Sequence, residues 1–464
     1  MSDPLSCFKA SDIRGTFPDP LSSHLAFALG MALASREKPR HVVIGHDVRL
    51  SCYTLEAALC AAFASKGIAT TCLGLVGTEE IYFAAAFANF DLGIMITASH
   101  NPADENGFKL VRRGARPISN DSGLLAIKES VRIVLATKTL SPPPHHAPPS
   151  TNSSYSQAYV DWLLTEAKLP AKNAQPSMKV LASIGNGAAG GVLSRLSPHL
   201  PFELILHEAR PDGHFPNGVP NPLLPERREN TRNTLLATHA DFAVAFDGDF
   251  DRCFFYDGFG NFIESYYIVG LLAQTLLSMH PKSTIIHDPR LYWNTQDLVR
   301  QYHGKAVLCK TGHAFIKERM RKEDALYGGE MSAHHYFRHF NYCDSGMLPF
   351  LLVAKLLLES GSSLNDLVSK RIQAFPCSGE INRKCANPQE LLEELERIYK
   401  ENAIFIDHTD GLDMHFPAWR FNVRASNTEP LLRINAESRH DLPLLQESTK
   451  ALLQTIDTLC AEQF

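Results

Sequence analysis

The sequence predicts several α/β domains built on parallel sheets, followed by a smaller α+β domain at the C-terminus. Its 464 residues exceed the roughly 250 to 300 at which a single hydrophobic core stops growing, which favours three or four domains. Short apolar runs alternate with helical patterns through most of the chain, as in a parallel α/β layer. After about Phe375 this alternation stops, and a helix-like run precedes short alternating segments, which is typical of an α+β domain.

The first elements follow in the order helix, strand, helix. The patterns predict a helix over Leu25 to Ala34, a strand over His41 to Ile44 and an amphipathic helix over Thr54 to Ser65. Further apolar strands that each lead into a polar loop are LGIMI before Thr97, KVLASI before Gly185, FAVAF before Asp247 and TIIH before Asp288. Ligands of open α/β sheets bind beyond the carboxyl ends of the strands, so we expect the functional residues in these loops.

The boundary between the first two domains is marked by proline. The segment Ser141 to Ser154 holds five prolines in 14 residues, which favours an extended linker over helix or sheet. In the last domain we expect a helix over Pro388 to Tyr399 and strands over Trp419 to Val423 and Leu431 to Ala436.

Composition excludes several classes of protein. With 45 basic and 50 acidic residues the formal charge is −5, so a dedicated nucleic-acid binder is not expected. The ten cysteines are scattered without a CxxC pair, which favours buried thiols in a reducing compartment over disulfides or structural zinc. The N-terminus lacks a basic and an apolar region. The apolar run Met347 to Leu358 is too short to cross a bilayer. We therefore expect a cytoplasmic protein that binds no membrane.

The loop after LGIMI carries a candidate nucleophile. It runs Thr97, Ala98, Ser99, His100, Asn101 and Pro102, with Lys109 close behind. A serine before Asn-Pro usually forms a hydrogen-bonded turn. A hydroxyl beside an imidazole and near an ammonium is also what phosphoryl transfer through serine requires.

The loop after FAVAF is a candidate metal site. Asp247, Asp249 and Asp251 alternate before Arg252, and three carboxylates at this spacing repel one another unless a cation intervenes. Oxygen ligands indicate Mg²⁺ or Ca²⁺. An EF-hand does not fit, because its sixth position would be Arg252 and its twelfth Gly258. The alternative is a solvated acidic turn.

Two further polar clusters suit sugar and phosphate. Gly328 to His335 combines an acid, a hydroxyl and imidazoles, and Lys310 to His313 lies upstream, where it could instead cap a helix. Arg424 to Pro430 offers a guanidinium, hydroxyls and an amide for a phosphate dianion, or forms an ordinary turn.

Together these loops resemble the α-D-phosphohexomutase family, most closely its bacterial phosphomannomutase/phosphoglucomutase branch. The resemblance rests on FKASDIRG, TASHNP, DGDFDR, GEMSAH and RASNTEP in this order and covers nearly the whole chain. It implies three similar α/β domains with mixed or parallel sheets and a smaller C-terminal α+β domain, around a central cleft. The implied boundaries are 1–145, 155–256, 257–372 and 373–464.

The resemblance also implies the role of each loop. Ser99 would be the phosphoserine, and Asp247, Asp249 and Asp251 would bind Mg²⁺ together with Ser99. The implied catalytic neighbours are Arg14, His100, Lys109 and His334. The implied substrate-binding residues are Arg252, Arg290, Lys310, His313, Glu330, Ser332, Arg424, Ser426, Asn427 and Thr428. The family usually has Tyr where this chain has Ser11.

The expected reaction is the interconversion of mannose 6-phosphate and mannose 1-phosphate through a phosphoserine enzyme and a hexose 1,6-bisphosphate, which would supply GDP-mannose synthesis. His334 or Lys109 would be the general base. The expected partners are small hexose phosphates, with the protein a monomer or weak dimer. Alternatives are a phosphoglucomutase acting mainly on glucose phosphates, a haloacid-dehalogenase-type phosphatase with Asp247 as nucleophile, and a non-catalytic sugar-phosphate sensor.

Overall fold

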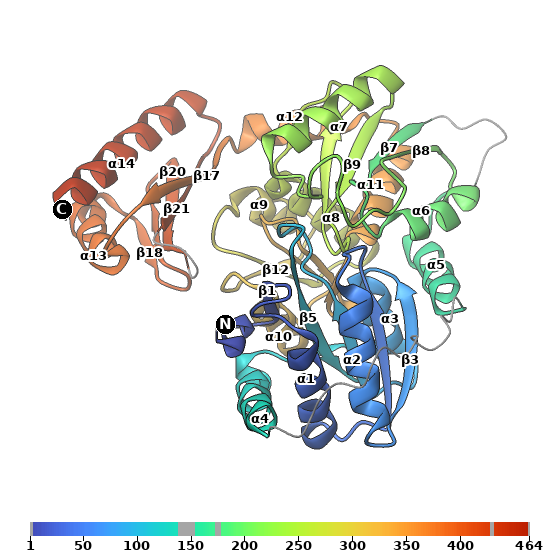
Figure 1. Cartoon of the computed structure of the whole chain (residues 1–464). Helices are drawn as coiled ribbons and strands as arrows, with labels where there is room; N and C mark the ends of the chain where they lie inside the picture. The colour runs from blue at the N-terminus through green and yellow to red at the C-terminus, as the bar shows by residue number, and fades with distance from the viewer. Residues whose placement is uncertain (1–2, 138–153, 172–177, 427–430, 463–464) are drawn as a thin grey trace. The chain divides into compact units, whose positions relative to one another are not determined.

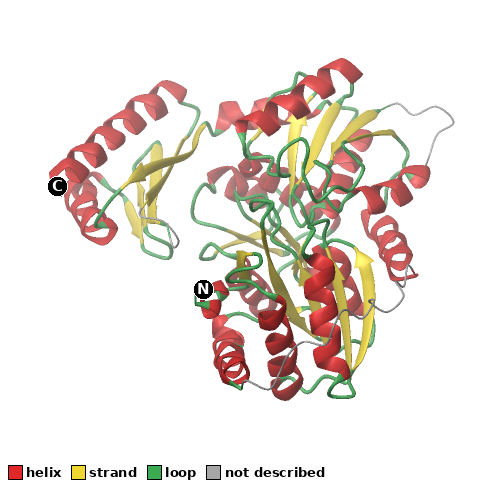
Figure 2. Ribbon diagram, in the orientation of Figure 1, coloured by secondary structure: helices red, strands yellow, loops and turns green. Residues whose placement is uncertain are grey.

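The structure is a computed structural model that describes residues 3–137, 154–171, 178–426 and 431–462. It divides into two compact units. The first holds Met1–Phe262 and His339–Glu359, and the second holds Ile263–Arg338 and Ser360–Phe464. Within these units, sheets alternate with helices along the chain (Figures 1 and 2).

The first sheet of the first unit presents the loop of Ser99. Its strands are β1 (Ile13–Thr16), β2 (His41–His46), β3 (Ala69–Leu75), β4 (Leu92–Ile96), β5 (Glu105–Arg112) and β6 (Arg116–Pro117). The strand order is β1-β5-β4-β2-β3, with β6 paired to β5. Strands β3, β2 and β4 are parallel, whereas β5 is antiparallel to β4 and to β1. The carboxyl ends of β2 and β4 therefore lie side by side.

Helices cover both faces of this sheet. They are α1 (Ser23–Arg36), α2 (Cys52–Ala64), α3 (Thr78–Phe87) and α4 (Leu124–Ala136). Helices α1, α2 and α4 share one core with Ile94 and Ile96 of β4. Gly93 points to the opposite face, where a Cβ on it would lie 3.1 Å from Ile81 of α3. Since side chains alternate along a strand, β4 is buried from both sides, as its apolar sequence predicts.

The second sheet of this unit presents the acidic loop. Its strands are β7 (Lys179–Ser183), β8 (Glu203–His207), β9 (Phe242–Phe246), β10 (Cys253–Asp257) and β11 (Phe262–Ile263), in the order β11-β10-β9-β7-β8. Strands β8, β7 and β9 are parallel, and β10 returns antiparallel to β9. The nearby helices are α5 (Ser154–Ala167), α6 (Gly190–Leu196), α7 (Pro225–Thr238) and, after strand β16 (Cys343–Asp344), α11 (Met347–Ser360). The acidic loop is thus the turn between β9 and β10.

The second unit begins with a third α/β layer. Its strands are β12 (Thr284–His287), β13 (Lys305–Leu308), β14 (Tyr327–Gly329) and β15 (His335–Phe337), and they follow the order β13-β12-β14-β15. Strand β12 is parallel to β13 and β14, and β15 is antiparallel to β14. Its helices are α8 (Ser265–Met279), α9 (Trp293–Gln301), α10 (His313–Glu323) and α12 (Leu364–Ala374).

The C-terminal part is an antiparallel sheet with two long helices. Its strands are β17 (Cys377–Lys384), β18 (Phe405–Asp407), β19 (Leu412–His415), β20 (Trp419–Ala425) and β21 (Leu431–Ser438), in the order β17-β21-β20-β19-β18. Helices α13 (Pro388–Tyr399) and α14 (Leu442–Glu462) pack on it through Leu395, Leu452 and Ile456. This confirms the α+β expectation, and the three preceding layers confirm the α/β class.

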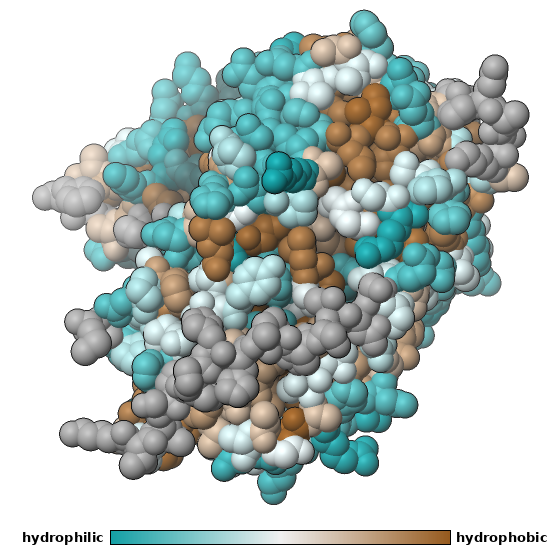
Figure 3. Space-filling model, turned by 45° about the vertical axis from the view of Figure 1, so that its right-hand side comes forward, coloured by the Kyte–Doolittle hydropathy of each residue, from teal (hydrophilic) through white to brown (hydrophobic). Residues whose placement is uncertain are grey.

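The expected elements lie close to where the sequence places them. LGIMI, FAVAF and TIIH are β4, β9 and β12, and α13 has the expected bounds. Residues 141–153 of the expected linker lie outside the described residues, and Ser154 begins α5. Among the described residues, no single helix has the length and apolarity to cross a membrane, although α11 and α12, bent by 98°, pass that test together. The face in Figure 3 carries hydrophilic residues interspersed with smaller hydrophobic patches.

Candidate active site

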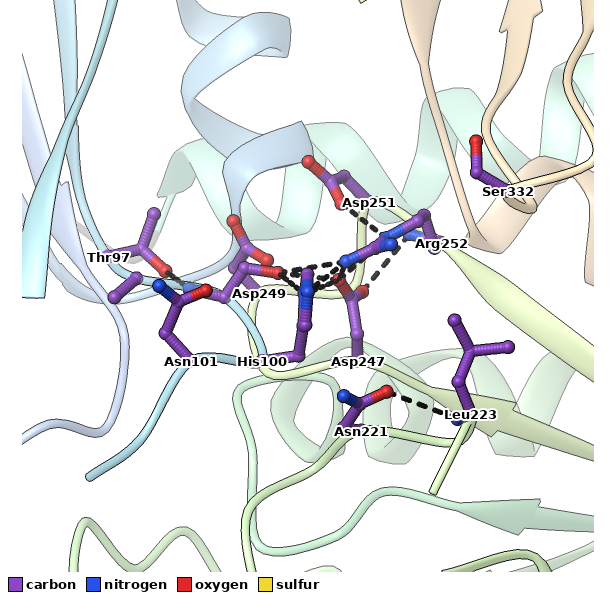
Figure 4. Close-up of polar contacts among 12 residues, drawn as sticks. Thr97, His100, Asn101, Asn221, Leu223, Asp247, Asp249, Asp251, Arg252 and Ser332 are labelled. Carbon is purple, nitrogen blue, oxygen red and sulfur yellow. Dashed lines mark hydrogen bonds and ion pairs between the residues drawn. The ribbon is translucent and has the colours of Figure 1, made fainter. Parts of the chain in front are cut away.

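Ser99 lies directly beyond the carboxyl end of β4 in a constrained turn. Its φ of 52° places it in the left-handed region, which non-glycine residues seldom adopt. Its hydroxyl donates a hydrogen bond of 2.7 Å to Oδ2 of Asp247 and lies 3.0 Å from Nδ1 of His100. The predicted nucleophile and the predicted metal loop therefore meet, as Figure 4 shows for the residues around them.

The three carboxylates of the acidic loop converge. Asp247, Asp249 and Asp251 are buried, and each offers an oxygen within 4.8 Å of the others. Phe250, between Asp249 and Asp251, has a φ of 49°, in the left-handed region that is typical of a tight turn. A solvated acidic turn does not fit this burial.

Cations partly neutralise this cluster. Nζ of Lys109, on β5, donates to Oδ2 of Asp249 at 2.6 Å and also to Asp251. Arg252 donates through Nε to Oδ2 of Asp247 at 3.1 Å and contacts Nδ1 of His100. Lys109 and Arg252 therefore offset part of the charge of the three carboxylates.

The donor set fits a hard divalent cation. Within the described residues, Oδ1 of Asp249 is buried and accepts no hydrogen bond, although a buried carboxylate oxygen normally has a partner. Three carboxylates and a serine oxygen form an all-oxygen set, which Mg²⁺ prefers. These residues would hold Mg²⁺ at the tip of the acidic loop.

Burial and charge shift the pKa values at this site. Burial raises the pKa of Asp247 to about 7. The positive charge of Arg252 opposes this rise, and the negative charges of Asp251 and Asp249 add to it. Burial lowers the pKa of Lys109, but the carboxylates of Asp249 and Asp251 outweigh it and raise that pKa above its ordinary value. Burial and the cations Arg252 and Arg14 hold the pKa of His100 well below its usual value. Lys109 is therefore a cation and His100 a neutral imidazole at neutral pH.

Arg14 also lies at this site. Its guanidinium donates to Asp12 at 2.7 Å, to the carbonyl of Ala98 at 3.1 Å and to the amide oxygen of Asn101 at 2.9 Å. Strand β1 carries it beside β5, with Arg14 opposite Gly107 in the register. The structure thus brings Arg14, Ser99, His100, Lys109 and the acidic loop together within the first unit.

Sequence reasoning missed three residues that hold these two loops. Arg49 and Asp47 follow β2, and both contact the Ser99 loop. Thr78, at the start of α3, donates its hydroxyl to Oδ2 of Asp249 at 2.5 Å. The tetrapeptide His-Asp-Val-Arg after a predicted parallel strand could have indicated the first two. No local pattern indicates Thr78, because its partner lies 171 positions away.

In the second unit, Glu330 is the centre of a buried polar group. Its Oε1 accepts from the backbone N–H of Gly312 at 3.0 Å, and its Oε2 accepts from the hydroxyl of Tyr336 at 2.5 Å. Arg290 lies 3.7 Å from Glu330 and pairs with Asp288. Burial raises the pKa of Glu330, although the positive charge of Arg290 acts to lower it.

Ser332 and His334 complete this group. The hydroxyl of Ser332 lies 3.1 Å from Nδ1 of His334 and 3.5 Å from Arg290, and His334 lies 3.6 Å from Glu330. His313 is the first residue of α10, so the stretch after Lys310 does lead into a helix. Lys310 is exposed, with its Nζ 5.3 Å from the ring centre of Phe315.

Arg424 lies at the end of β20 in the same unit. It is buried and lies 3.3 Å from Glu380. Burial and the positive charge of Arg290 lower its pKa. A guanidinium can donate two parallel hydrogen bonds to an anion such as a phosphate. Ser426 donates its backbone N–H to the carbonyl of Leu431 at 2.8 Å, and Asn427 and Thr428 lie outside the described residues.

The fold and these groups define an α/β enzyme that transfers phosphoryl groups. The sequence matches the phosphoglucomutase/phosphomannomutase α/β/α domains I, II and III over residues 6–133, 157–260 and 264–375, and the C-terminal domain over residues 380–453. The chain belongs to the phosphoglucomutase/phosphomannomutase family. It is an isomerase that acts as an intramolecular phosphotransferase, so the haloacid-dehalogenase and sensor alternatives do not fit.

Curated relatives span the whole chain. A phosphomannomutase of Escherichia coli is 50% identical over 463 residues, covering 98% of this chain and 99% of that protein. A protein of Xanthomonas campestris that carries the name phosphohexose mutases is 49% identical over 448 residues, covering 97% of this chain and 98% of that protein.

Solved structures agree on the fold. A phosphoglucomutase/phosphomannomutase family protein of Burkholderia thailandensis superposes with a TM-score of 0.84 at 28% identity, over 99% of this chain and 98% of that one. A phosphoglucomutase of Paramecium superposes with a TM-score of 0.74 at 15% identity, over 97% of this chain and 94% of that one. This is a likeness of fold alone.

Proposed function

We propose that this chain is a phosphomannomutase that interconverts mannose 6-phosphate and mannose 1-phosphate. The observation that carries the proposal is the hydrogen bond between Ser99 and Asp247, which joins a candidate phosphoserine to a buried cluster of three carboxylates. The choice of mannose is supported by the 50% identical relatives that carry the name phosphomannomutase. The name of the Xanthomonas relative covers hexoses more broadly, so glucose phosphates are the second candidate substrates.

In the proposed cycle the phosphoryl group leaves phosphorylated Ser99 for the free hydroxyl of a hexose monophosphate. The bond between phosphorus and Oγ of Ser99 breaks, a bond to the sugar oxygen forms, and the hydroxyl proton passes to a base. The resulting 1,6-bisphosphate turns around and returns its other phosphoryl group to Ser99. When bound at Asp247, Asp249 and Asp251, Mg²⁺ would neutralise phosphate oxygens and stabilise the leaving serine oxygen.

The chain's own cations have defined roles in this cycle. Lys109, Arg252 and Arg14 would offset the charge of the incoming sugar phosphate. The raised pKa of Lys109 favours it as a donor to phosphate oxygens over a general base. His334 stays our candidate for the base, with Ser332 and Glu330 beside it.

The remaining groups would bind the substrate. Glu330 and Ser332 would form hydrogen bonds with the sugar hydroxyls, and Arg290 and His313 would line the same region. Arg424, with Lys310, Ser426, Asn427 and Thr428, would take the non-reacting phosphate. The proposed domains span 1–145, 155–256, 257–372 and 373–464. We further propose a cytoplasmic monomer or weak dimer that binds hexose phosphates and whose product supplies GDP-mannose synthesis.

The test compares the wild-type chain with Ser99→Ala in the presence of Mg²⁺ and glucose 1,6-bisphosphate. We expect Ser99→Ala to fold normally, because it removes one loop hydroxyl and no core volume, and to lose nearly all conversion of mannose 1-phosphate. Peptide mass spectrometry should find phosphate on Ser99 of the wild type. Ser130→Ala, on α4, is the matched control and should keep full activity. Turnover by Ser99→Ala, or phosphate on Asp247 instead, would refute the proposal.

A further inference from the structure

The backbone of Ser99 is held on both sides. A Cβ on Gly248 of the acidic loop would lie 2.4 Å from the carbonyl oxygen of Ser99, so the two loops touch. The left-handed φ of Ser99 is a conformation that persists only where the surroundings impose it. Something on the other side of the loop must therefore hold the serine against the acidic loop.

Arg49 provides that support. Its guanidinium is buried and donates to four backbone carbonyls between Ser99 and the start of β5: Nη2 donates to Ser99 at 2.9 Å and Asn101 at 2.7 Å, and Nη1 donates to Pro102 at 2.5 Å and Glu105 at 2.7 Å. An irregular loop has no neighbouring strand to satisfy its carbonyls, so the carbonyls that face Arg49 need such a donor. A planar guanidinium can serve four acceptors at fixed angles, which an ammonium cannot.

Asp47 ties Arg49 to a second support of the same serine. Its Oδ2 lies 3.3 Å from Nε of Arg49 and accepts from the hydroxyl of Thr97 at 2.7 Å. That hydroxyl in turn accepts from the backbone N–H of Ser99 at 2.8 Å. The carbonyl and the N–H of Ser99 are thus both connected by hydrogen bonds to residues that directly follow β2. In the sheet, His46 of β2 pairs with Ile96 of β4.

We infer that Arg49 is a positioning residue for phosphoryl transfer: it holds the Ser99 loop so that the serine oxygen stays against Asp247. The contacts of its guanidinium described above are with backbone carbonyls and Asp47, and it also lies 5.5 Å from the centre of the Phe215 ring. Arg49 therefore acts on the reaction through Ser99. The inference rests on the proposed function, because it requires Ser99 to carry the phosphoryl group.

Arg49→Lys tests this in the full-length chain with Mg²⁺ and glucose 1,6-bisphosphate. Lysine keeps the charge but loses the fork, and a misplacement of about 1 Å can cost about 10²-fold in rate. We expect kcat to fall by about 10²-fold with KM for mannose 1-phosphate changed by less than about threefold. The rate at which Ser99 acquires phosphate from the bisphosphate, followed by intact mass, should fall in parallel.

Arg112→Lys is the matched control. Arg112 also donates to a carboxylate, Glu37 at 2.7 Å, and to a backbone carbonyl, that of Ser122 at 2.9 Å, within the same sheet. Arg112 is less buried than Arg49, so we expect Arg112→Lys to lower the melting temperature less and to leave kcat unchanged. A merely structural role for Arg49 predicts that Arg49→Lys lowers the melting temperature but keeps full kcat at a temperature where it is folded.

Thr97→Val provides an independent test with little change in volume. It removes the hydroxyl that links Asp47 to the N–H of Ser99, and we expect the same selective loss of kcat. The double variant should lose less than the product of the two single effects, because both hold one loop. If Arg49→Lys does not fold, Thr97→Val decides alone.

The outcomes separate the two proposals. Full kcat and full phosphorylation rate in folded Arg49→Lys, or in Thr97→Val where the first variant does not fold, would overturn the inference. The proposed function would still stand in that case if wild-type Ser99 carries phosphate. Absence of phosphate on wild-type Ser99 would instead refute both.

Discussion

The hydroxyl of Ser99 donates a 2.7 Å hydrogen bond to Asp247, although 148 positions separate the two residues in the chain. This contact joins two loops from two different sheets of the first unit. A phosphate on Ser99 would therefore lie at the three carboxylates, where its own negative charge increases the need for a cation.

Asp249→Asn should weaken activation by Mg²⁺. Within the described residues, Oδ1 of Asp249 is buried and accepts no hydrogen bond, so it is open to a metal, and an amide in its place loses the charge. We expect the Mg²⁺ concentration for half-maximal activity to rise by about 10- to 100-fold. Asp212→Asn, at a partly exposed carboxylate, is the control. An unchanged Mg²⁺ titration would argue for an acidic turn without a metal.

Arg424→Lys should raise KM for mannose 1-phosphate and mannose 6-phosphate alike. In the proposed cycle the bisphosphate presents each end in turn, so one distal phosphate site serves both substrates. Loss of the two-pronged guanidinium should raise KM by about tenfold. Steady-state kinetics in both directions measure this, with Arg397→Lys on the surface of α13 as control. An effect on only one substrate would contradict a shared site.

Glu79 should make stability depend on pH. Its carboxylate, at the start of α3, accepts from Gly346 N–H at 2.8 Å and from the hydroxyls of Tyr159 and Ser345. Burial raises its pKa from 4.5 to about 8. The folded state therefore binds more protons than the unfolded state between these pH values, and this contribution to stability is lost as pH rises.

Glu79→Gln should remove this pH dependence. An amide can accept from Gly346 and donate to the two hydroxyls, so we expect the variant to gain stability relative to wild type as pH rises from about 5 to 8. Melting temperatures across this range, with exposed Glu203→Gln as control, measure the difference. A constant difference between wild type and variant would show that Glu79 is not the titrating group.

The enzyme should accept mannose and glucose 1-phosphates but reject galactose 1-phosphate. If Glu330 and Ser332 bind the hydroxyls at carbons 3 and 4, inversion at carbon 4 leaves a buried polar group unpaired, and such sites can discriminate by about 10⁴-fold. Mannose and glucose differ only at carbon 2. We would measure kcat/KM for the three sugars under the same Mg²⁺ and bisphosphate. Galactose turnover within about tenfold of mannose would refute these contacts.

The sequence by itself determined the elements and predicted the chemistry of each loop. LGIMI and FAVAF are apolar runs of the length of β4 and β9, and hydrophobic periodicity is a local signal. Ser99 and the three aspartates were found because their residue types are unusual together after buried strands. Lys109 was predicted to lie near Ser99, but its ion pairs with Asp249 and Asp251 were not.

Only the tertiary structure decided which residues hold the reactive ones in place. Arg49 reaches the Ser99 loop because β2 and β4 are neighbours in the sheet, and Thr78 reaches Asp249 because α3 begins beside the acidic loop. The position of Arg49 just beyond β2 is visible in the sequence, but its partners are not, and no local pattern indicates Thr78. Their roles follow from hydrogen bonds between segments far apart in the chain, which residue type and spacing do not encode.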